Sequence, residues 1–306
     1  MSRNTGLKAD LGRIGCELGG AHLTRQARRA TFNTFTEVMR QLGQVIRCAK
    51  QIGGRHLKMF VQERAAQGIS ARTCANELSH LRAALKHIGK EGFVRSAEWN
   101  NRALGVERGS RIGTKLPLSD AEIRAFQERM AALGRSGIGE TLELQRALGL
   151  REAEAIRGGN ADTLARWQHE LEKRGCVSVI EGTKGGKARD VKPADVGRAL
   201  SAIQAAQSVL RHANSDASAT GQRYLVTQAD GSATTGLRQS LSVYKNLCYR
   251  AGIQSHGARY AFARERIQAY RDQGYSEREA RAATSQDLGH GDSRGRYIAS
   301  VYARGA

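Results

Sequence analysis

Cationic and nucleophilic side chains recur in five short segments of the sequence. In chain order, these segments are ALGLREAEAI (147–156), EGTKGGKARDV (181–191), SHGARYAFA (255–263), LGHGD (288–292) and IASVYAR (298–304). Guanidinium groups can hold the charged oxygens of a phosphodiester through charge-assisted hydrogen bonds. A tyrosine hydroxyl can attack the phosphorus to form a covalent intermediate, and histidine or lysine can move the protons. The residue types therefore suit transfer of a phosphodiester without a metal ion.

The order of these segments and the residues around them resemble the catalytic half of the tyrosine recombinases, the phage-integrase family. Specific motifs carry the resemblance over roughly residues 118–306, whereas over 32–107 it rests on helical character and position. It implies a mainly α-helical chain with a small β-hairpin: a helical, SAM-like core-DNA-binding domain followed by an α+β catalytic domain. It also implies that DNA strands are cut and rejoined through a 3′-phosphotyrosyl intermediate, without a cofactor, a metal ion or ATP.

Two residues near the start of the catalytic half resemble the family's first motif. By this resemblance, Arg151 is the first clamp on the attacked phosphate, and Glu154 supports it. An amphipathic helix with one arginine on its surface would show the same local pattern. The assignment therefore depends on the motifs that follow.

A glycine-rich turn between two strand-like runs, CVSVI and RDVKP, predicts a β-hairpin. The resemblance assigns the general acid to Lys184 in this turn, while Lys187 is the alternative and a candidate DNA contact. A phosphate-binding P-loop is excluded, because Glu181 stands where that motif needs its first glycine and Ala188 follows Lys187. A flexible basic turn without catalytic function is the simpler interpretation.

His256 and Arg259 form an H-x-x-R pair within SHGARYAFA. Residues three apart lie on one face of a helix, and the aromatic and small residues that follow predict packing into a core. By resemblance, His256 aids proton transfer at the phosphate, and Arg259 is the second clamp. His290 in LGHGD resembles the family's second histidine, which donates a hydrogen bond to a non-bridging oxygen. Without the other motifs, the H-x-x-R pair could simply begin a helix on the surface, and His290 could be a helix-capping residue.

Two tyrosines near the end of the chain are candidates for the nucleophile. Tyr302 follows Val301 and fits the family context, a β-branched residue before the tyrosine, better than Tyr297 does. Tyr302 is therefore the predicted nucleophile, and Tyr297 is the alternative. Arg259 and His290 are 31 positions apart (290 − 259), an interval that predicts a longer helix pair and leaves the site intact.

The elements that must position these residues divide into two parts. Residues 1–30 are polar and rich in glycine and arginine, which predicts a flexible basic arm, and residues 31–107 show the apolar spacing of a helical domain. A linker is expected at 108–117, where glycine, serine and proline gather, and residues 118–306 are expected to form the catalytic domain. Ser119 begins this domain with a capping-box pattern.

One predicted helix in the first part bears two further candidate DNA contacts. Ser70 would cap this helix and Gly89 would end it. Arg82 and Lys86 lie together on its polar face. Contact with DNA phosphates and simple exposure to solvent are equally compatible with this position.

The composition indicates a polyanionic partner. The 306 residues contain 49 Lys and Arg against 29 Asp and Glu, a formal net charge of +20. A chain this basic usually binds nucleic acid. An anionic membrane surface is the other such partner, but no apolar run approaches the ~20 residues of a spanning helix. The N-terminal residues lack the apolar centre of a signal peptide, which predicts a cytoplasmic protein. The family resemblance implies that this protein is encoded by a bacterium or phage and is nucleoid-associated.

Metal binding is not expected. The five cysteines are scattered without a C-x-x-C pair, and the eight histidines show no metal-ligand spacing. This distribution argues for reduced thiols and against a zinc site.

The expected partner is double-stranded DNA. The resemblance implies a homotetramer on two DNA sites, together with DNA-bending or directionality proteins. Two other functions would use the same fold: DNA relaxation of the type IB topoisomerase kind, and DNA binding by a catalytically silent accessory protein. A basic RNA-binding protein is disfavoured, because aromatic residues make up only 5% of the chain and no stacking motif is present.

Overall fold

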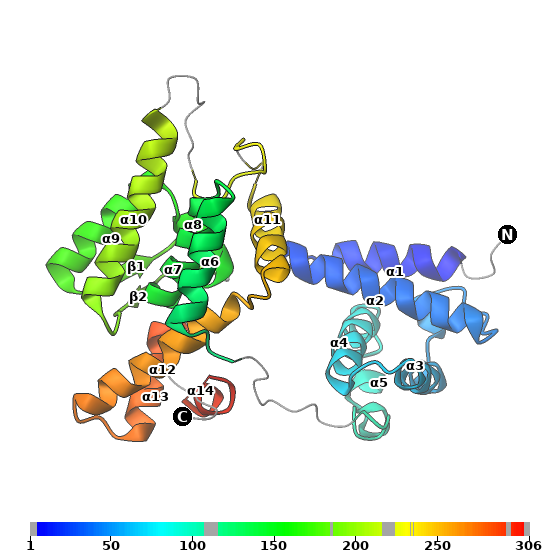
Figure 1. Ribbon diagram of the computed structural model, residues 1–306. Coiled ribbons are helices and arrows are strands. Elements are labelled where there is room, and N and C mark those ends of the chain that lie inside the picture. The colour runs from blue at the N-terminus through cyan, green and yellow to red at the C-terminus, as the bar shows by residue number, and fades with distance from the viewer. Residues whose placement is uncertain are drawn as a thin grey trace. The chain divides into compact units, whose positions relative to one another are not determined.

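Helices account for most of the chain, as the predicted fold class requires (Figure 1). The computed structural model describes residues 5–106, 116–183, 186–215, 224–232, 234, 236–291 and 295–302. The chain divides into two units, Met1–Ser110 and Arg111–Ala306. The division falls within the predicted linker, 108–117, most of which lies outside the described residues.

Helices are the only regular elements among the described residues of the N-terminal unit. They are α1 (Thr5–Glu17), α2 (His22–Gln41), α3 (Gly54–Ala66), α4 (Ala71–His87) and α5 (Glu91–Arg95), with short 3₁₀ turns at Ala49–Gln51 and Ala97–Trp99. One hydrophobic core joins the helices. At its centre, Phe35 of α2 and Phe60 of α3 meet edge to face, with 5.3 Å between ring centroids.

The prediction of a flexible arm over residues 1–30 is wrong for the part that the structure describes. α1 begins at Thr5, and α2 follows it directly after a short turn. Leu7, Leu11 and Ile14 of α1 are fully buried in the core of the unit. Their spacing puts them on one face of a helix, while most of the glycine, charged and other polar residues between them are exposed.

The helix predicted after Ser70 is confirmed as α4. The Ser70 hydroxyl accepts a hydrogen bond from the backbone N–H of Thr73 (3.2 Å), which is how an N-cap satisfies a free helix donor. The helix ends at His87, shortly before the predicted Gly89. Its apolar face packs in the core of the N-terminal unit.

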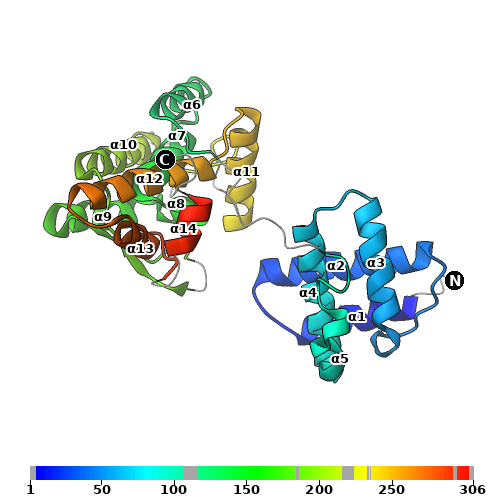
Figure 2. The ribbon, with the colours of Figure 1, turned by 90° about the horizontal axis from the view of Figure 1, so that it is seen from below.

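The C-terminal unit combines helices with one small sheet. Its helices are α6 (Asp120–Ala132), α7 (Ser136–Leu148), α8 (Glu152–Gly158), α9 (Ala161–Arg174), α10 (Val196–Ser215), α11 (Leu237–Arg250), α12 (His256–Asp272), α13 (Glu277–Asp287) and α14 (Gly295–Val301). α7 contacts α6, α10 and α12, so it lies in the middle of the unit. α14 lies against α13 (Figure 2).

The predicted β-hairpin is confirmed. β1 (Val177–Val179) and β2 (Arg189–Val191) pair antiparallel, and Val179 lies opposite Arg189. The valines of both strands are fully buried in the same core as Trp167 of α9. The hairpin is thereby anchored to the centre of the C-terminal unit.

The capping box predicted at Ser119 is also confirmed. The Ser119 hydroxyl accepts from the backbone N–H of Glu122 (3.2 Å), and the Glu122 carboxylate accepts from the Ser119 N–H (2.7 Å). The neighbouring Leu118 donates its N–H to the Gly257 carbonyl (3.1 Å). The beginning of the unit is therefore tied to α12, the helix that contains the H-x-x-R pair.

The turn between α7 and α8 requires a glycine. Gly149 has a φ of 58°, in the left-handed region that other residues rarely adopt. A Cβ at this position would lie 2.4 Å from the ring of Phe262, a core residue of α12. The turn places Arg151 at the N-cap of α8, close to α12.

Candidate active site

The C-terminal end of α13 binds three arginine side chains from other elements. The Leu288 carbonyl accepts hydrogen bonds from Arg259 of α12 and from Arg151 (3.1 Å). The Asp287 carbonyl accepts one from Arg189 of β2 (2.9 Å). The last carbonyls of a helix lack partners within it and form the negative end of its dipole. They therefore hold three guanidinium groups close together, next to the predicted histidine.

Arg259 is completely buried. Its two Nη atoms donate to the carbonyls of Gly149 and Leu288, while its Nε has no hydrogen-bond partner among the described residues. Burial, together with the charges of Arg151 and Arg189, lowers the pKa of Arg259 to about 10. The group still remains charged at neutral pH. A buried cation with an unused donor is suited to binding an anion.

Arg151 is more accessible, since its side chain is 26% exposed. Its Nη1 donates to Glu154 Oε1 (2.7 Å), and its backbone N–H donates to Glu154 Oε2 (2.7 Å). Glu154 therefore holds Arg151 at both its backbone and its side chain. The exposed part of the guanidinium group is left for a ligand.

Arg189 belongs to this site, although its sequence context predicts no role for it. Its Nη1 and Nη2 donate to the two oxygens of Glu154, at 2.7 Å each. Burial tends to raise the pKa of Glu154, but the Arg189 hydrogen bonds and charge, and the N–H of Arg151, lower it to about 2. The hint in the sequence was its place at the start of the second predicted strand, beside the lysine-bearing turn.

Tyr302 reaches the same region from the end of α14. Its Oη lies 3.3 Å from Nε2 of His290, and Tyr302 is only 3% exposed. Its ring packs against that of Tyr260, with 4.4 Å between centroids. The phenol is also close enough to Arg259 to oppose the fall of the Arg259 pKa. The structure thus brings Tyr302, His290 and Arg259 together.

The alternative tyrosine and the first histidine border this group. Tyr297 is 37% exposed, and its ring centroid lies 5.1 Å from that of His290. His256 is the first residue of α12, and its ring centroid lies 6.3 Å from that of Tyr302. Both residues are therefore near the site, and Tyr302 is the more deeply buried of the two tyrosines.

The lysine-bearing turn is described only in part. Lys184, the predicted general acid, lies outside the described residues, whereas Lys187 is described and exposed. Gly182, earlier in the turn, packs so closely on α8 that a Cβ would lie 2.3 Å from the Ala153 carbonyl oxygen. The turn at Gly182 is therefore held against the helix that follows Arg151.

The two candidate DNA contacts of α4 both have partners within the N-terminal unit. Arg82 donates to Asn101 Oδ1 and to the Trp99 carbonyl, at 2.6 Å each, and burial lowers its pKa. Lys86 pairs with Glu91 (3.0 Å), and its side chain is 61% exposed. Arg82 therefore stabilises the end of this unit, and Lys86 is accessible to a ligand. Contact of either residue with DNA stays a prediction.

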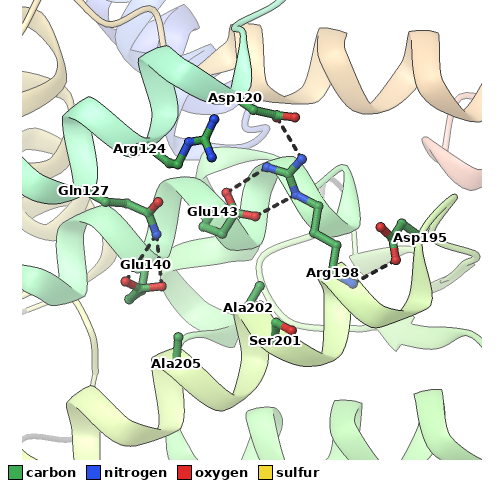
Figure 3. A pocket seen from close by; sticks show the side chains of 10 residues that line it. All are labelled: Asp120, Arg124, Gln127, Glu140, Glu143, Asp195, Arg198, Ser201, Ala202 and Ala205. Carbon is green, nitrogen blue, oxygen red and sulfur yellow. Dashed lines mark hydrogen bonds and ion pairs between the residues drawn. The ribbon is translucent and has the colours of Figure 1, made fainter.

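A separate pocket of about 430 Å³ lies between α6, α7 and α10 (Figure 3). None of the predicted catalytic residues lines it. Its charged residues are mainly carboxylates: Asp120, Glu140, Glu143 and Asp195, with Arg124 and Arg198. The carboxylates disfavour a phosphodiester in this pocket, so it is not the candidate site.

Two other kinds of site are absent from the described residues. Within them, no group of three or more His, Cys, Asp or Glu side chains could hold a metal ion. No helix in that part of the chain is long and apolar enough to cross a membrane.

Several solved structures share this fold. A lambda integrase tetramer bound to a Holliday junction has a TM-score of 0.61 at 14% identity, over 97% of this chain and 78% of that chain. The Tn1549 transposon integrase in complex with transposon right end DNA has a TM-score of 0.58 at 14% identity, over 95% and 94% of the two chains. The XerH site-specific recombinase bound to difH has a TM-score of 0.53 at 17% identity, over 95% of this chain and 79% of that chain. At these identities, the likeness establishes the fold alone.

Sequence comparison identifies the family. A search of curated protein sequences found no match. The family profile described as "Phage integrase, N-terminal" matches residues 2–94, and the profile described as "Integrase" matches residues 105–265. The second match alone spans more than half of the chain. The protein therefore belongs to the phage-integrase family of tyrosine recombinases.

Proposed function

We propose that this protein is a site-specific DNA recombinase in which Tyr302 attacks a DNA phosphate. The observation that carries the proposal is the 3.3 Å contact between Tyr302 Oη and His290 Nε2, beside the buried guanidinium of Arg259. This arrangement supplies a nucleophile, a hydrogen-bonding imidazole and a fixed positive charge in one place. These are the groups that transfer of a phosphodiester to a phenol requires.

The proposed reaction exchanges one ester bond for another. The Tyr302 oxygen forms a bond to phosphorus, the bond from phosphorus to the 5′ oxygen breaks, and a 3′-phosphotyrosyl link remains. His256 takes part in proton transfer from the phenol, and Lys184, or Lys187 in its place, protonates the departing 5′ oxygen. The 5′ hydroxyl of a partner strand then reverses the step. The phosphodiester energy is conserved throughout, so ATP is not needed.

Two arginines would neutralise the attacked phosphate. Arg259, with a pKa of about 10, is charged at neutral pH, and Arg151 has a partly exposed guanidinium. Each would donate to a non-bridging oxygen, where negative charge faces the protein in the transition state. His290 would donate to the same group. Because these residues supply the positive charge, the proposed reaction requires no metal ion.

The proposed ligand is double-stranded DNA, bound as a homotetramer on two sites, with DNA-bending or directionality proteins as further partners. Three observations support the binding of DNA, and the first of them also supports the tetramer. A similar structure is that of a lambda integrase tetramer bound to a Holliday junction, and another is that of the Tn1549 integrase in complex with transposon DNA. The net charge of +20 suits binding through DNA phosphates.

Strand exchange between two duplexes tests this function. Two duplexes of different length, both carrying sequence from the neighbourhood of the gene, are incubated with the protein in EDTA without ATP. With one duplex labelled, we expect a labelled product of recombinant length. Relaxation of supercoiled plasmid without this product would indicate a topoisomerase-like enzyme. Salt-sensitive binding without product or covalent complex would indicate a catalytically silent DNA-binding protein.

A further inference from the structure

We infer that Arg189 is a positioning residue of the active site: it holds Glu154 and, through Glu154, sets the orientation of Arg151. The inference rests on the proposed function, in which Arg151 is the first phosphate clamp. It assigns a role to a residue of β2 that lies outside the five catalytic positions that the structure describes.

Arg189 is not placed to bind the phosphate itself. Its Nη1 and Nη2 bind the two oxygens of Glu154 at 2.7 Å, and its Nε donates to the Asp287 carbonyl (2.9 Å). All three of its nitrogen atoms are thus engaged, and its side chain is 7% exposed. Apart from its charge, which also lowers the pKa of Arg259 and which a lysine would keep, Arg189 would therefore act on the phosphate through the residues that it holds.

Glu154 links the two arginines. Its Oε1 accepts from Nη1 of Arg151 and from Nη1 of Arg189, both at 2.7 Å. Its carboxylate is completely buried, and an ionised carboxylate is costly in such a place unless cations and hydrogen bonds compensate. Arg189 supplies the largest single part of that compensation. Arg151 can therefore keep part of its guanidinium group for a ligand.

Arg189 also supports Arg151 by a second route, through the turn after α13. Arg151 Nη2 donates to the carbonyls of Leu288 (3.1 Å) and Gly289 (3.4 Å) in this turn. The stem of Arg189 lies directly against Gly289, because a Cβ on that glycine would be 2.7 Å from Arg189 Cδ. Both supports of Arg151, the carboxylate and the turn, therefore contact Arg189.

A second arginine of the C-terminal unit offers a matched control. Arg198 of α10 binds Glu143 through Nε (2.8 Å) and Nη2 (3.1 Å), and binds Asp120 through Nη1 (2.8 Å) (Figure 3). Like Arg189, Arg198 therefore donates two hydrogen bonds to one carboxylate and a third hydrogen bond to another residue. It lies at the acidic pocket, which none of the predicted catalytic residues lines.

The test compares Arg189→Lys with Arg198→Lys in the full-length protein. Lysine keeps the charge but loses the two-pronged hydrogen bond. Each protein receives a nicked duplex that traps the covalent complex. One version carries an ordinary phosphodiester at the cleavage point, and the other carries a methylphosphonate, in which a neutral methyl group replaces one charged oxygen. Two quantities are measured for each protein on each substrate: the single-turnover rate at saturating DNA, and the affinity for DNA.

We expect Arg189→Lys to lower the rate on the phosphodiester about 10- to 100-fold, the usual effect of a misplaced catalytic group, with DNA affinity unchanged. The loss should be much smaller on the methylphosphonate, because less charge is there for Arg151 to hold. Arg198→Lys should keep both rates. A merely structural role of Arg189 would lower both rates equally. An equal loss on the two substrates, or no loss at all, would overturn the inference.

Glu154→Gln provides a second variant, in case Arg189→Lys melts below the assay temperature. This variant should also lose much less rate on the methylphosphonate than on the phosphodiester. If Glu154→Gln loses the same rate on both substrates, the inference is equally overturned. If both variants fold, the double variant should lose no more cleavage rate than the worse single variant, since the two residues act as a unit.

If the wild type forms no covalent complex on its mapped site, the proposed function fails. If the wild type cleaves and Arg189→Lys behaves like Arg198→Lys, only the inference fails.

Discussion

The hydroxyl of Tyr302, at the end of α14, lies 3.3 Å from Nε2 of His290, in the turn after α13. Tyr302 is close enough to the completely buried Arg259 of α12 to oppose the fall of its pKa, and His290 shortly follows Leu288, whose carbonyl accepts a hydrogen bond from Arg259. Groups from three elements thus meet within one small region of the C-terminal unit. The chemistry proposed for the protein depends on this meeting.

Arg259→Lys should lower the single-turnover cleavage rate by at least about 100-fold, the usual cost of losing one donor to a developing negative charge. Lysine keeps the positive charge, but its single nitrogen replaces the two separate Nη atoms that bind Gly149 and Leu288 and the Nε that is left for a phosphate oxygen. The rate is measured on a nicked duplex with the DNA in excess, and thermal melting checks the fold. A rate within tenfold of the wild type would remove Arg259 from the proposed role.

Glu154→Gln should change the dependence of stability on pH. The folded pKa of Glu154, about 2, lies below its ordinary value of 4.5. Its carboxylate therefore stabilises the folded protein above pH 4.5, and this contribution is lost as the pH falls toward 2. The difference, 4.5 − 2 = 2.5 pKa units, corresponds to roughly 3 kcal/mol.

Urea unfolding of wild type and Glu154→Gln at several pH values measures this contribution. The wild type should be the more stable protein at pH 7, and its advantage should shrink as the pH falls below 4.5. An advantage that stays constant over this range would contradict the assigned pKa.

Gly289→Ala should damage the site more than Gly291→Ala does. Both glycines have positive φ values, 65° and 82°, so alanine costs about 1 kcal/mol of backbone strain at either position. Only at Gly289 would the new Cβ meet a neighbour, Arg189 Cδ at 2.7 Å, since the space around Gly291 is open. Melting temperature and cleavage rate should both fall further in Gly289→Ala. Equal effects would show that contact with Arg189 does not matter.

Much of the site could be predicted because its patterns are local. An H-x-x-R pair followed by apolar residues predicts a helix that packs into a core, and Arg259 is indeed buried on α12. The turn before Arg151 depends on a single glycine, Gly149, and a glycine after a run of helical residues is a common signal for the end of a helix. In the same way, Ser70 and Ser119 cap the helices that they were predicted to cap.

The remaining features depend on contacts between distant residues. Arg189 and its partner Glu154 are 35 positions apart, and nothing in the strand RDV distinguishes a buried arginine from an exposed one. The carbonyls at the end of α13 bind three arginines only because the fold brings these elements together. In α1, Leu7, Leu11 and Ile14 carry a helical pattern, but the polar, glycine-rich composition around them favoured a flexible arm.

Lys86 and Arg82 should respond differently to replacement by alanine. Lys86→Ala should weaken DNA binding and lower the slope of log affinity against log salt by about one, as expected for one lost phosphate contact. Its melting temperature should not change, because its side chain is 61% exposed. Arg82→Ala should lower the melting temperature, because two hydrogen bonds of 2.6 Å are lost. An unchanged salt slope would exclude Lys86 from the DNA contacts.

The most direct measurement locates the tyrosine that becomes linked to DNA. A nicked duplex carrying the cleavage site is incubated with the wild type, the covalent complex is digested with nuclease and protease, and mass spectrometry identifies the modified peptide. We predict a nucleotide on Tyr302, no covalent complex with Tyr302→Phe, and a wild-type yield with Tyr297→Phe. A nucleotide on Tyr297, or a covalent complex that persists in Tyr302→Phe, would contradict the assignment of Tyr302 as the nucleophile.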